Sequence, residues 1–151
     1  MLKARDIMTR EVLTVTPEMP VEQLADLLWE HRISGAPVLD ESGKLVAVAT
    51  ESDLIDQTKK VHIPTVAAIL DSIIVLENPH KLDEEIRKMA GSRVKDIATR
   101  KLVTVTTEAP LDEIASIMAR QRVHTLPVVD AEGKLVGVIG KSDIIKTYIK
   151  K

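Results

Sequence analysis

The sequence predicts an α/β (α+β) fold in which two tandem β-α-β-β-α repeats pack together with pseudo-two-fold symmetry. The first observation is a repeat without gaps: a shift of 90 residues takes Asp53 to Asp143 and aligns KLVAVATESDLIDQ with KLVGVIGKSDIIKT. The second is that each segment is an apolar run of strand length that continues into a helical pattern. The third is composition, because 44% hydrophobic and 29% charged residues are typical of a folded globular chain.

The repeat also divides the chain. We assign residues 1–58 to the first repeat, 59–92 to a structured connector and 93–151 to the second repeat. A repeat of this length exceeds one supersecondary unit, so it indicates a duplicated small domain and not a solenoid. Each half alone would bury only a marginal core, so we expect the two halves to share one.

The first repeat opens with a short helical turn at 4–10, and alternating β-branched residues predict a strand at 12–15. Pro20 suits the first position of the amphipathic helix that follows, and the positive charge at 31–32 suits its C-terminal end. The residues expected on the buried face of this helix are Val21, Leu24, Ala25 and Leu28.

A β-hairpin follows, after residues 34–35 break the helix. We expect buried strands at 36–39 and 44–49, joined by the turn residues 40–43. Thr50 then stands at an N-cap position, directly before the closing helix of the repeat.

The second repeat follows the same plan, with a helical turn at 94–98, a strand at 102–105 and a helix from Leu111. A hairpin with strands at 127–129 and 134–139 leads into the closing helix, which Asp143 opens. The side chains expected to face the core from the long helix are Ile114, Ala115 and Met118.

The connector has no counterpart elsewhere in the chain. Hydrophobic spacing predicts a helix after Pro64, a brief extended run at 73–76 and a helix at 82–89. The acidic cluster at 83–85 falls in the first turn of the last helix, so we interpret it as solvated surface. Neither of the two connector histidines, His62 and His80, has neighbours at metal-ligand spacing, so no metal site is predicted.

Composition excludes several classes of protein. A net charge of −2, with one Trp, one Tyr and no Phe, offers neither the basic surface nor the stacking rings of a nucleic-acid-binding protein. The absence of cysteine suits a reducing compartment. The N-terminus lacks the apolar core of a signal peptide, and no apolar run approaches the length of a membrane span. We therefore expect a soluble cytoplasmic protein that associates with neither nucleic acid nor membrane.

Thr50 and Asp53 allow two interpretations. Unpaired N–H groups and the positive end of the helix dipole meet at a helix start, so a phosphate beside Thr50 would find donors there, and Asp53 could accept from the hydroxyls of a sugar. The alternative is a capping box that stabilises the helix start without a ligand. Repetition of the pattern around Asp143 favours a binding site.

Three differences separate the copies. Gly140 stands at the position of the N-cap threonine, so the hydroxyl is absent from the second copy. His124 replaces Ser34, where it is either an ordinary loop residue or a contact to phosphate. Trp29 is replaced by Ala119, so one copy alone has a large ring, which serves a packing edge or an interface.

The order of motifs identifies a family. The pair IMTREVLTVTPEMPVEQLADLL and ISGAPVLDESGKLVAVATESDLI occurs again as IATRKLVTVTTEAPLDEIASIM and VHTLPVVDAEGKLVGVIGKSDII. Nearly the whole chain therefore resembles a tandem pair of CBS domains, the cystathionine β-synthase type of repeat, in the arrangement called a Bateman module. The resemblance implies two clefts between the repeats and the binding of adenosine-containing ligands such as AMP, ADP, ATP or S-adenosylmethionine, without catalysis.

The resemblance also implies roles for individual residues. The family's (Ser/Thr)-x-x-Asp motif places Thr50 at phosphate and Asp53 at ribose. Asp143, preceded by Ser142, takes the ribose position of the second copy, and Gly140 departs from the motif, which weakens the case for phosphate there. Each cleft is expected to draw on both copies, with the Asp53 cleft using the first strand of the second copy. The expected adenine contacts are Val12, Leu13, Ser34, Gly35 and Ala36 in one copy and Leu102, Val103, His124, Thr125 and Leu126 in the other.

Two functions remain open at this point. One is a ligand-sensing module, and the other is a structural or partner-binding module with degenerate clefts, which the loss of the hydroxyl at Gly140 favours. An enzyme is not expected, because no nucleophile with an adjacent base, no metal cluster and no phosphate-cradling glycine loop occurs, and no obligatory cofactor is implied. Exposed apolar positions such as Trp29 and Ile33 predict a homodimer. The regulated protein partner is not identified.

Overall fold

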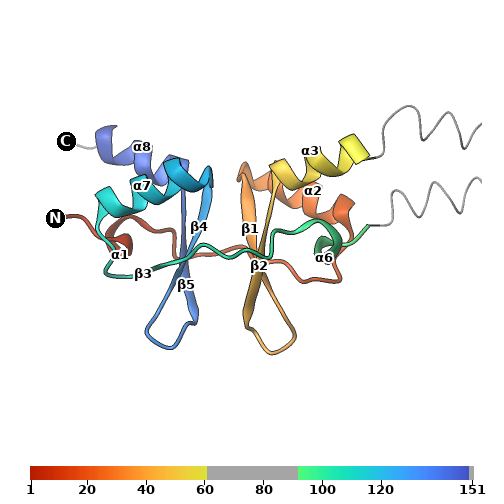
Figure 1. Cartoon of the computed structure of the whole chain (residues 1–151), viewed down its shortest axis with the longest axis horizontal. Helices are drawn as coiled ribbons and strands as arrows, with labels where there is room; N and C mark the ends of the chain where they lie inside the picture. The colour runs from red at the N-terminus through yellow and green to blue at the C-terminus, as the bar shows by residue number, and fades with distance from the viewer. Residues whose placement is uncertain (61–91, 150–151) are drawn as a thin grey trace, which may run out of the picture.

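The computed structural model describes residues 1–60 and 92–149, and it confirms the predicted mixture of helices with small antiparallel hairpins (Figure 1). Every element expected between 61 and 91 lies outside the described residues, as do the acidic cluster at 83–85 and both connector histidines.

The described elements fall into two matching series. The first copy contains α1 (Ala4–Ile7), α2 (Val21–His31), β1 (Gly35–Leu39), β2 (Leu45–Thr50) and α3 (Glu51–Lys60). The second copy contains α6 (Val94–Ile97), β3 (Val105–Thr106), α7 (Leu111–Gln121), β4 (Thr125–Val129), β5 (Leu135–Gly140) and α8 (Lys141–Ile149).

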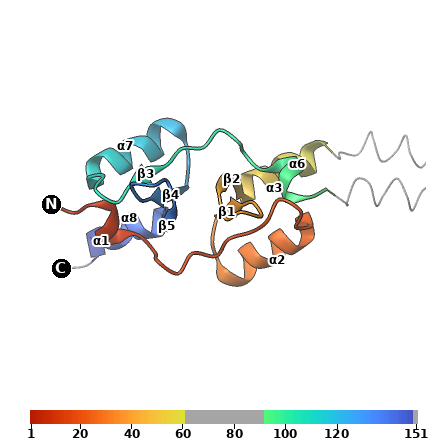
Figure 2. The ribbon, with the colours of Figure 1, turned by 90° about the horizontal axis from the view of Figure 1, so that it is seen from below.

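The four long helices within residues 1–60 and 92–149 lie on one side of the strands. In Figure 1, α2, α3, α7 and α8 are above the strands, and the loops of the β1–β2 and β4–β5 hairpins point the opposite way. Figure 2, seen from below, shows the two copies side by side, with α2 and α7 on opposite sides of the long axis. One copy has an antiparallel sheet of order β1-β2, and the other has a sheet of order β3-β4-β5 in which β3 runs parallel to β4.

The first strand of each copy is shorter than the sequence predicts. Within 12–15, only Val15 bridges to β1, opposite Val38, and the corresponding strand β3 begins only at Val105. The Val15 N–H donates to the Pro37 carbonyl at 3.0 Å, but Pro37 has no N–H with which to continue the ladder toward residue 13. Proline in the hairpin strand therefore ends the pairing.

The long helices also differ in detail from the prediction. Pro20 is the N-cap of α2 and not its first helical residue. The helix ends because Arg32 adopts a left-handed conformation with φ of 52°, so residues 34–35 do not break it. In α7, Ala115 is exposed, and Ile117 is the partly buried residue that packs on the core.

The described residues form two hydrophobic cores and not the single shared core expected from the sequence, and each core includes a helical turn from the other copy. Ala4 of α1 is fully buried in the core of the second copy, and Val94 of α6 is fully buried in the core of the first. The Ala4 N–H donates to the Ala109 carbonyl at 2.8 Å, and the Val94 N–H donates to the Met19 carbonyl at 2.9 Å. The two copies therefore exchange their N-terminal turns.

Ion pairs hold each exchanged turn from the outside. Glu108 accepts from Lys3 at 2.7 Å and also pairs with Arg5, and in the other copy Glu18 pairs with Lys95 at 2.9 Å. The hydrogen bond from Lys3, with the nearby positive charges, lowers the pKa of Glu108. These groups are exposed, so the pairs position the turns and contribute little to stability.

Where each exchanged segment packs on the sheet of the other copy, the sizes of the two facing side chains are complementary. Thr9 and Val138 exchange two backbone hydrogen bonds, of 2.8 and 3.0 Å, next to which Met8 covers Gly137. A Cβ on Gly137 would lie 2.4 Å from the Met8 sulfur. The equivalent pair in the first copy is two alanines, Ala98 and Ala47. A large residue therefore faces glycine at one junction, and both equivalent positions at the other are alanine.

Gly137→Ala is expected to lower the free energy of unfolding by about 1–3 kcal/mol, because the new methyl overlaps Met8. In a Met8→Ala background the same change should cost much less, because the contacts to the Met8 sulfur and Cγ are removed and only the 3.2 Å contact to the Cβ of residue 8 remains, while the unfolded chain loses freedom. Urea denaturation of the four proteins measures the coupling. An equal cost in both backgrounds would show that Met8 does not require the glycine.

Candidate functional site

A cleft of about 960 Å³ lies between the two copies, and we call it the central cleft. Its walls come from the segment after α1, from the end of α2 and start of β1, and from the junction of β5 with α8. Residues from both copies that line it include Thr9, Leu13, Ser34, Thr125, Gly140 and Asp143.

Asp143 is fixed by both copies at one wall of the cleft. Its Oδ2 accepts from the Gly140 N–H at 2.8 Å, across the strand-to-helix junction, and its Oδ1 accepts from the Thr9 hydroxyl at 3.2 Å. Thr9 reaches this position because the exchanged N-terminal segment pairs with β5. The carboxylate is therefore already aimed at the start of α8 before any ligand arrives.

Asp53 is held in the same way. The Thr50 N–H donates to Asp53 Oδ2 at 2.9 Å, and the Asp53 N–H donates to the Thr50 hydroxyl oxygen at 3.2 Å, which is a complete capping box. The Thr50 hydroxyl also donates to Oδ2 at 3.0 Å, and the Thr99 hydroxyl of the second copy donates to Oδ1 at 3.2 Å. The hydroxyl that the sequence assigns to phosphate is engaged within the cap.

The centre of the module is tightly packed. The hydroxyls of Ser34 and Thr125 lie 3.2 Å apart, and Thr125 is buried. A Cβ on Gly35 would lie 2.6 Å from the Thr125 hydroxyl and 3.1 Å from the Ala49 carbonyl. Gly35 is therefore required for the close approach of the two copies.

The predicted site residues are distributed unevenly. Those that line the central cleft are Leu13, Ser34, Gly35, Thr125, Ser142 and Asp143. Those outside its lining are Val12, Ala36, Thr50, Asp53, Leu102, Val103, His124 and Leu126. Ala36 and Leu126 are fully buried in the cores, where they supply packing, while His124 and Leu102 are exposed.

Several lining residues were not predicted from the sequence. Thr9 occupies the same repeat position as Thr99, but their contacts to the aspartates depend on the exchange of segments, which the repeat alone does not reveal.

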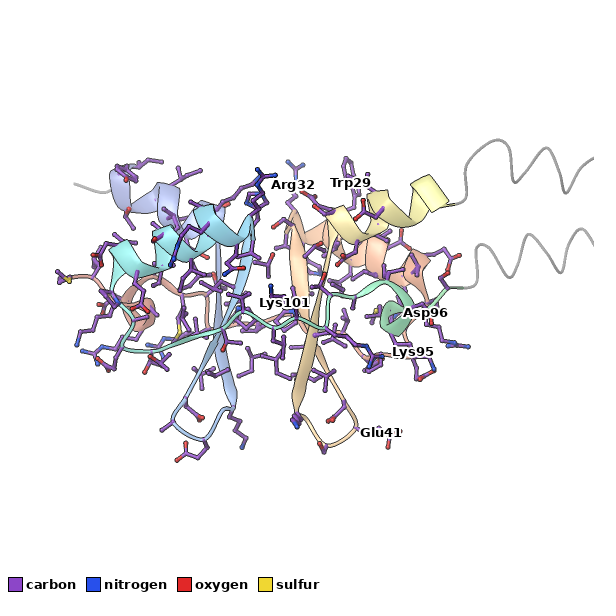
Figure 3. All side chains as sticks on the ribbon, viewed as in Figure 1. Trp29, Arg32, Glu41, Lys95, Asp96 and Lys101 are labelled. Atoms are coloured by element: carbon purple, nitrogen blue, oxygen red, sulfur yellow. The ribbon has the colours of Figure 1, made fainter. Side chains whose placement is uncertain are left out.

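Figure 3 shows Trp29 and Arg32 projecting on the helix side of the molecule, far from Glu41 in the hairpin loop. The charged residues lining the cleft are Arg32, Lys141 and Lys146 with Glu11, Glu30, Glu51 and Asp143.

The chemistry available at the cleft is recognition of a polar ligand. Carboxylate oxygens can accept from sugar hydroxyls, and the N–H groups at the start of α8 with Lys141 can receive an anion. Among the described residues, no group of histidine, aspartate and glutamate side chains is arranged to hold a metal ion. In the same part of the chain, no helix has both the length and the apolar character required to cross a bilayer.

Two segments of the sequence match the model of one protein family. The model for the CBS domain matches residues 4–59 and again 94–150. Protein MJ1426 of Methanocaldococcus jannaschii is 31% identical over 153 residues, which cover 96% of this chain and 90% of that protein. CBSX1, a chloroplastic CBS domain-containing protein of Arabidopsis thaliana, is 28% identical, and the chain spans 58% of its length.

The fold also matches a solved structure. The crystal structure of CBSX2 of Arabidopsis thaliana in complex with AMP superposes with a TM-score of 0.74 at 25% sequence identity. The match covers 99% of this chain and 98% of that one.

Gly140→Thr is expected to raise the free energy of unfolding without ligand by about 0.5–1 kcal/mol, because it adds a capping hydroxyl and restricts the unfolded chain. Among the described glycines only Gly43 and Gly133 have positive φ, and a Cβ on Gly140 would meet the His124 carbonyl at an ordinary 3.6 Å. Urea denaturation measures the change. Gly140→Val is the control, since an equal gain there would mean that the hydroxyl makes no cap.

Proposed function

The chain belongs to the CBS domain family, with two copies of the domain, and we propose that it is a non-catalytic regulatory module that binds an adenosine-containing ligand between them. The observation that carries the proposal is the central cleft, which residues of both copies line and where Asp143 is oriented by Thr9 of the other copy. Its volume of about 960 Å³ is that of a small-molecule site. The structure of CBSX2 with AMP supports the class of ligand.

The lining residues suggest how such a ligand would lie. Asp143 accepts from the ribose hydroxyls, taking the place that the Thr9 hydroxyl now fills. The phosphate lies at the start of α8, where Ser142 and Lys141 supply donors and positive charge. The adenine lies against Leu13 and the backbone of residues 34–35, on the first copy. One molecule then contacts both copies and stabilises their association.

As the binding site we rank the central cleft, which Asp143 lines, ahead of the second cleft that the family resemblance implies beside Asp53. The sequence alone favours Asp53 because its copy retains the threonine hydroxyl. In the structure, however, the Thr50 hydroxyl donates to the Asp53 carboxylate and accepts from the Asp53 N–H, so it is already engaged in the helix cap. Residues at the Asp53 side, including Val103 and His124, belong to the second proposed cleft, with His124 near phosphate. AMP, ADP, ATP and S-adenosylmethionine remain the candidate ligands.

A second candidate function is a structural or partner-binding module whose clefts stay empty. One observation favours it: the oxygens of both aspartates already accept hydrogen bonds within the protein. The protein partner that either function would serve is unidentified. We place the protein in the cytoplasm, since a chain without cysteine suits a reducing compartment.

We also propose that the module is a homodimer. Trp29 is 84% exposed, and such a ring on an otherwise well-packed helix is typical of an interface. Ile33, which the sequence also placed on the surface, is instead half-buried and packs against the core of the first copy. The dimer proposal therefore depends on Trp29 and on the apolar residues of α3 and α8.

AMP is expected to raise the melting temperature of the wild-type protein, because a ligand at 100 times its dissociation constant stabilises by roughly 2.7 kcal/mol. Asp143→Ala should remove most of this increment, and Asp53→Ala should remove less. For each variant the melting temperature with ligand is compared with that of the same variant without ligand, so that the stability lost with the helix cap does not enter the comparison. Adenosine and inorganic phosphate serve as controls for the two halves of the ligand. No shift with any adenosine ligand would favour the structural alternative, and a larger loss with Asp53→Ala would reverse the ranking.

Sedimentation without nucleotide is expected to show a dimer at micromolar concentration, and Trp29→Glu should dissociate it. A charge at this position would have to be buried without a partner. Glu41→Lys is the control, because Glu41 lies in the hairpin loop on the opposite side of the molecule (Figure 3). A wild-type monomer at all concentrations would contradict the dimer.

A further inference from the structure

The charged side chains that line the central cleft are divided between the two copies. The first copy contributes three carboxylates, from Glu11, Glu30 and Glu51. Beside Asp143, helix α8 of the second copy contributes two lysines, Lys141 and Lys146. Arg32, at the end of α2, is the one positive charge that the first copy adds to this lining. The wall from the first copy is therefore mainly acidic, and the wall from α8 is mainly basic.

Six of these charged groups have no partner in the described part of the chain. Every ion pair among the described residues fixes one of the exchanged turns, and none involves a side chain of the cleft. The structure likewise gives the three glutamates, the arginine and the two lysines no side-chain hydrogen bond within residues 1–60 and 92–149. Asp143 differs, because Thr9 and the Gly140 N–H already hold its carboxylate. Six charges of both signs are thus open to a ligand.

Lys141 stands where its own helix disfavours a positive charge. It is the first residue of α8, at the positive end of the helix dipole. The equivalent helix α3 begins with Glu51, whose negative charge the dipole favours. Stabilisation of the helix therefore does not account for Lys141, whereas contact with an anionic group in the cleft does.

Contacts at the centre of the module place the first residues of α3 and α8 on either side of the boundary between the copies. The Glu51 N–H donates to the Ser34 carbonyl at 2.9 Å, and the Ser34 hydroxyl lies 3.2 Å from that of Thr125. Thr125 is paired in the sheet with Gly140, which directly precedes Lys141. A carboxylate and an ammonium group therefore flank the same contact without forming an ion pair with each other.

We infer that the central cleft contains a subsite for a zwitterion, which binds an ammonium group on the carboxylates of the first copy and a carboxylate group on the lysines of α8. This inference rests on the proposed function and assigns the 5′ substituent of the adenosine ligand. The substituent is an amino acid, as in S-adenosylmethionine, and not a chain of phosphates.

The division of charge is the reason for this choice. A phosphate group carries about two negative charges at neutral pH. The lysines of α8 would attract it, but the three glutamates of the first copy would repel it, more strongly with each phosphate added. An amino acid presents one charge of each sign, so it matches both walls at once.

Two related thioethers test the subsite without any mutation. S-Adenosylhomocysteine has the adenosine thioether of 5′-methylthioadenosine with an amino acid group added. Calorimetry is expected to show that it binds at least about tenfold more tightly than 5′-methylthioadenosine, because it gains hydrogen bonds between charged groups. It should also bind more tightly than AMP or ATP. Equal affinity for the two thioethers, or tighter binding of either nucleotide, would overturn the inference.

Single substitutions then test each half of the subsite. Lys141→Gln and Glu51→Gln should each weaken the binding of S-adenosylhomocysteine by about tenfold and leave that of 5′-methylthioadenosine unchanged. Lys134→Gln and Glu41→Gln are the matched controls, because they remove the same charges from the hairpin loops, and they should alter neither affinity. An equal effect of the loop variants would show that overall charge is read and not a subsite, which would refute the inference.

Failure of this inference and failure of the proposed function give different results. Binding of AMP and 5′-methylthioadenosine, with no gain from the amino acid group, would leave an adenosine site and remove the zwitterion subsite. Binding of none of these adenosine compounds would refute the proposed function, and the inference with it.

Discussion

Each hydrophobic core of this protein is closed by a helical turn that belongs, in sequence, to the other copy. Ala4 and Val94 are fully buried in these borrowed positions, and backbone hydrogen bonds to Ala109 and Met19 fix the turns in place. Neither copy can complete its core by itself, because the side chains that fill the last part of it arrive from outside. Each copy therefore contributes buried residues to the core of the other, so the contact between the copies is part of both cores.

The same exchange constructs the candidate site. The segment that follows each borrowed turn pairs with the edge of the opposite sheet, which brings Thr9 to Asp143 and Thr99 to Asp53. Each aspartate thus stands at the start of one copy's helix and is oriented by the other copy. A ligand that contacts Asp143 would also contact residues of the first copy, so its binding energy would favour the closed arrangement of both. The contacts that join the two copies are therefore also the contacts that line the candidate site.

The sequence predicts the repeat, the order of its elements and both aspartates, because hydrophobic periodicity and helix-capping chemistry are local. It does not predict the exchange, since a turn at residues 4–7 has the same pattern whether it packs on its own copy or on the other. The short first strand follows from Pro37, a local residue whose effect needs the parallel register to be known. The commitment of the Thr50 hydroxyl and the burial of Ala36 and Leu126 are matters of packing, which one sequence does not reveal.

The two junctions between exchanged segment and sheet use side chains of different size, and this difference depends on both copies belonging to one chain. A single repeat that lent its turn to an identical partner would have formed the same structure as a pair of separate chains, and every substitution would have altered both junctions at once. Joining the two copies in one chain removes that restriction. Met8 covers Gly137 at one junction, whereas the equivalent positions at the other, 98 and 47, are both alanine, and a single chain allows the two junctions to differ. A substitution at one junction therefore leaves the volume of the side chains at the other unchanged.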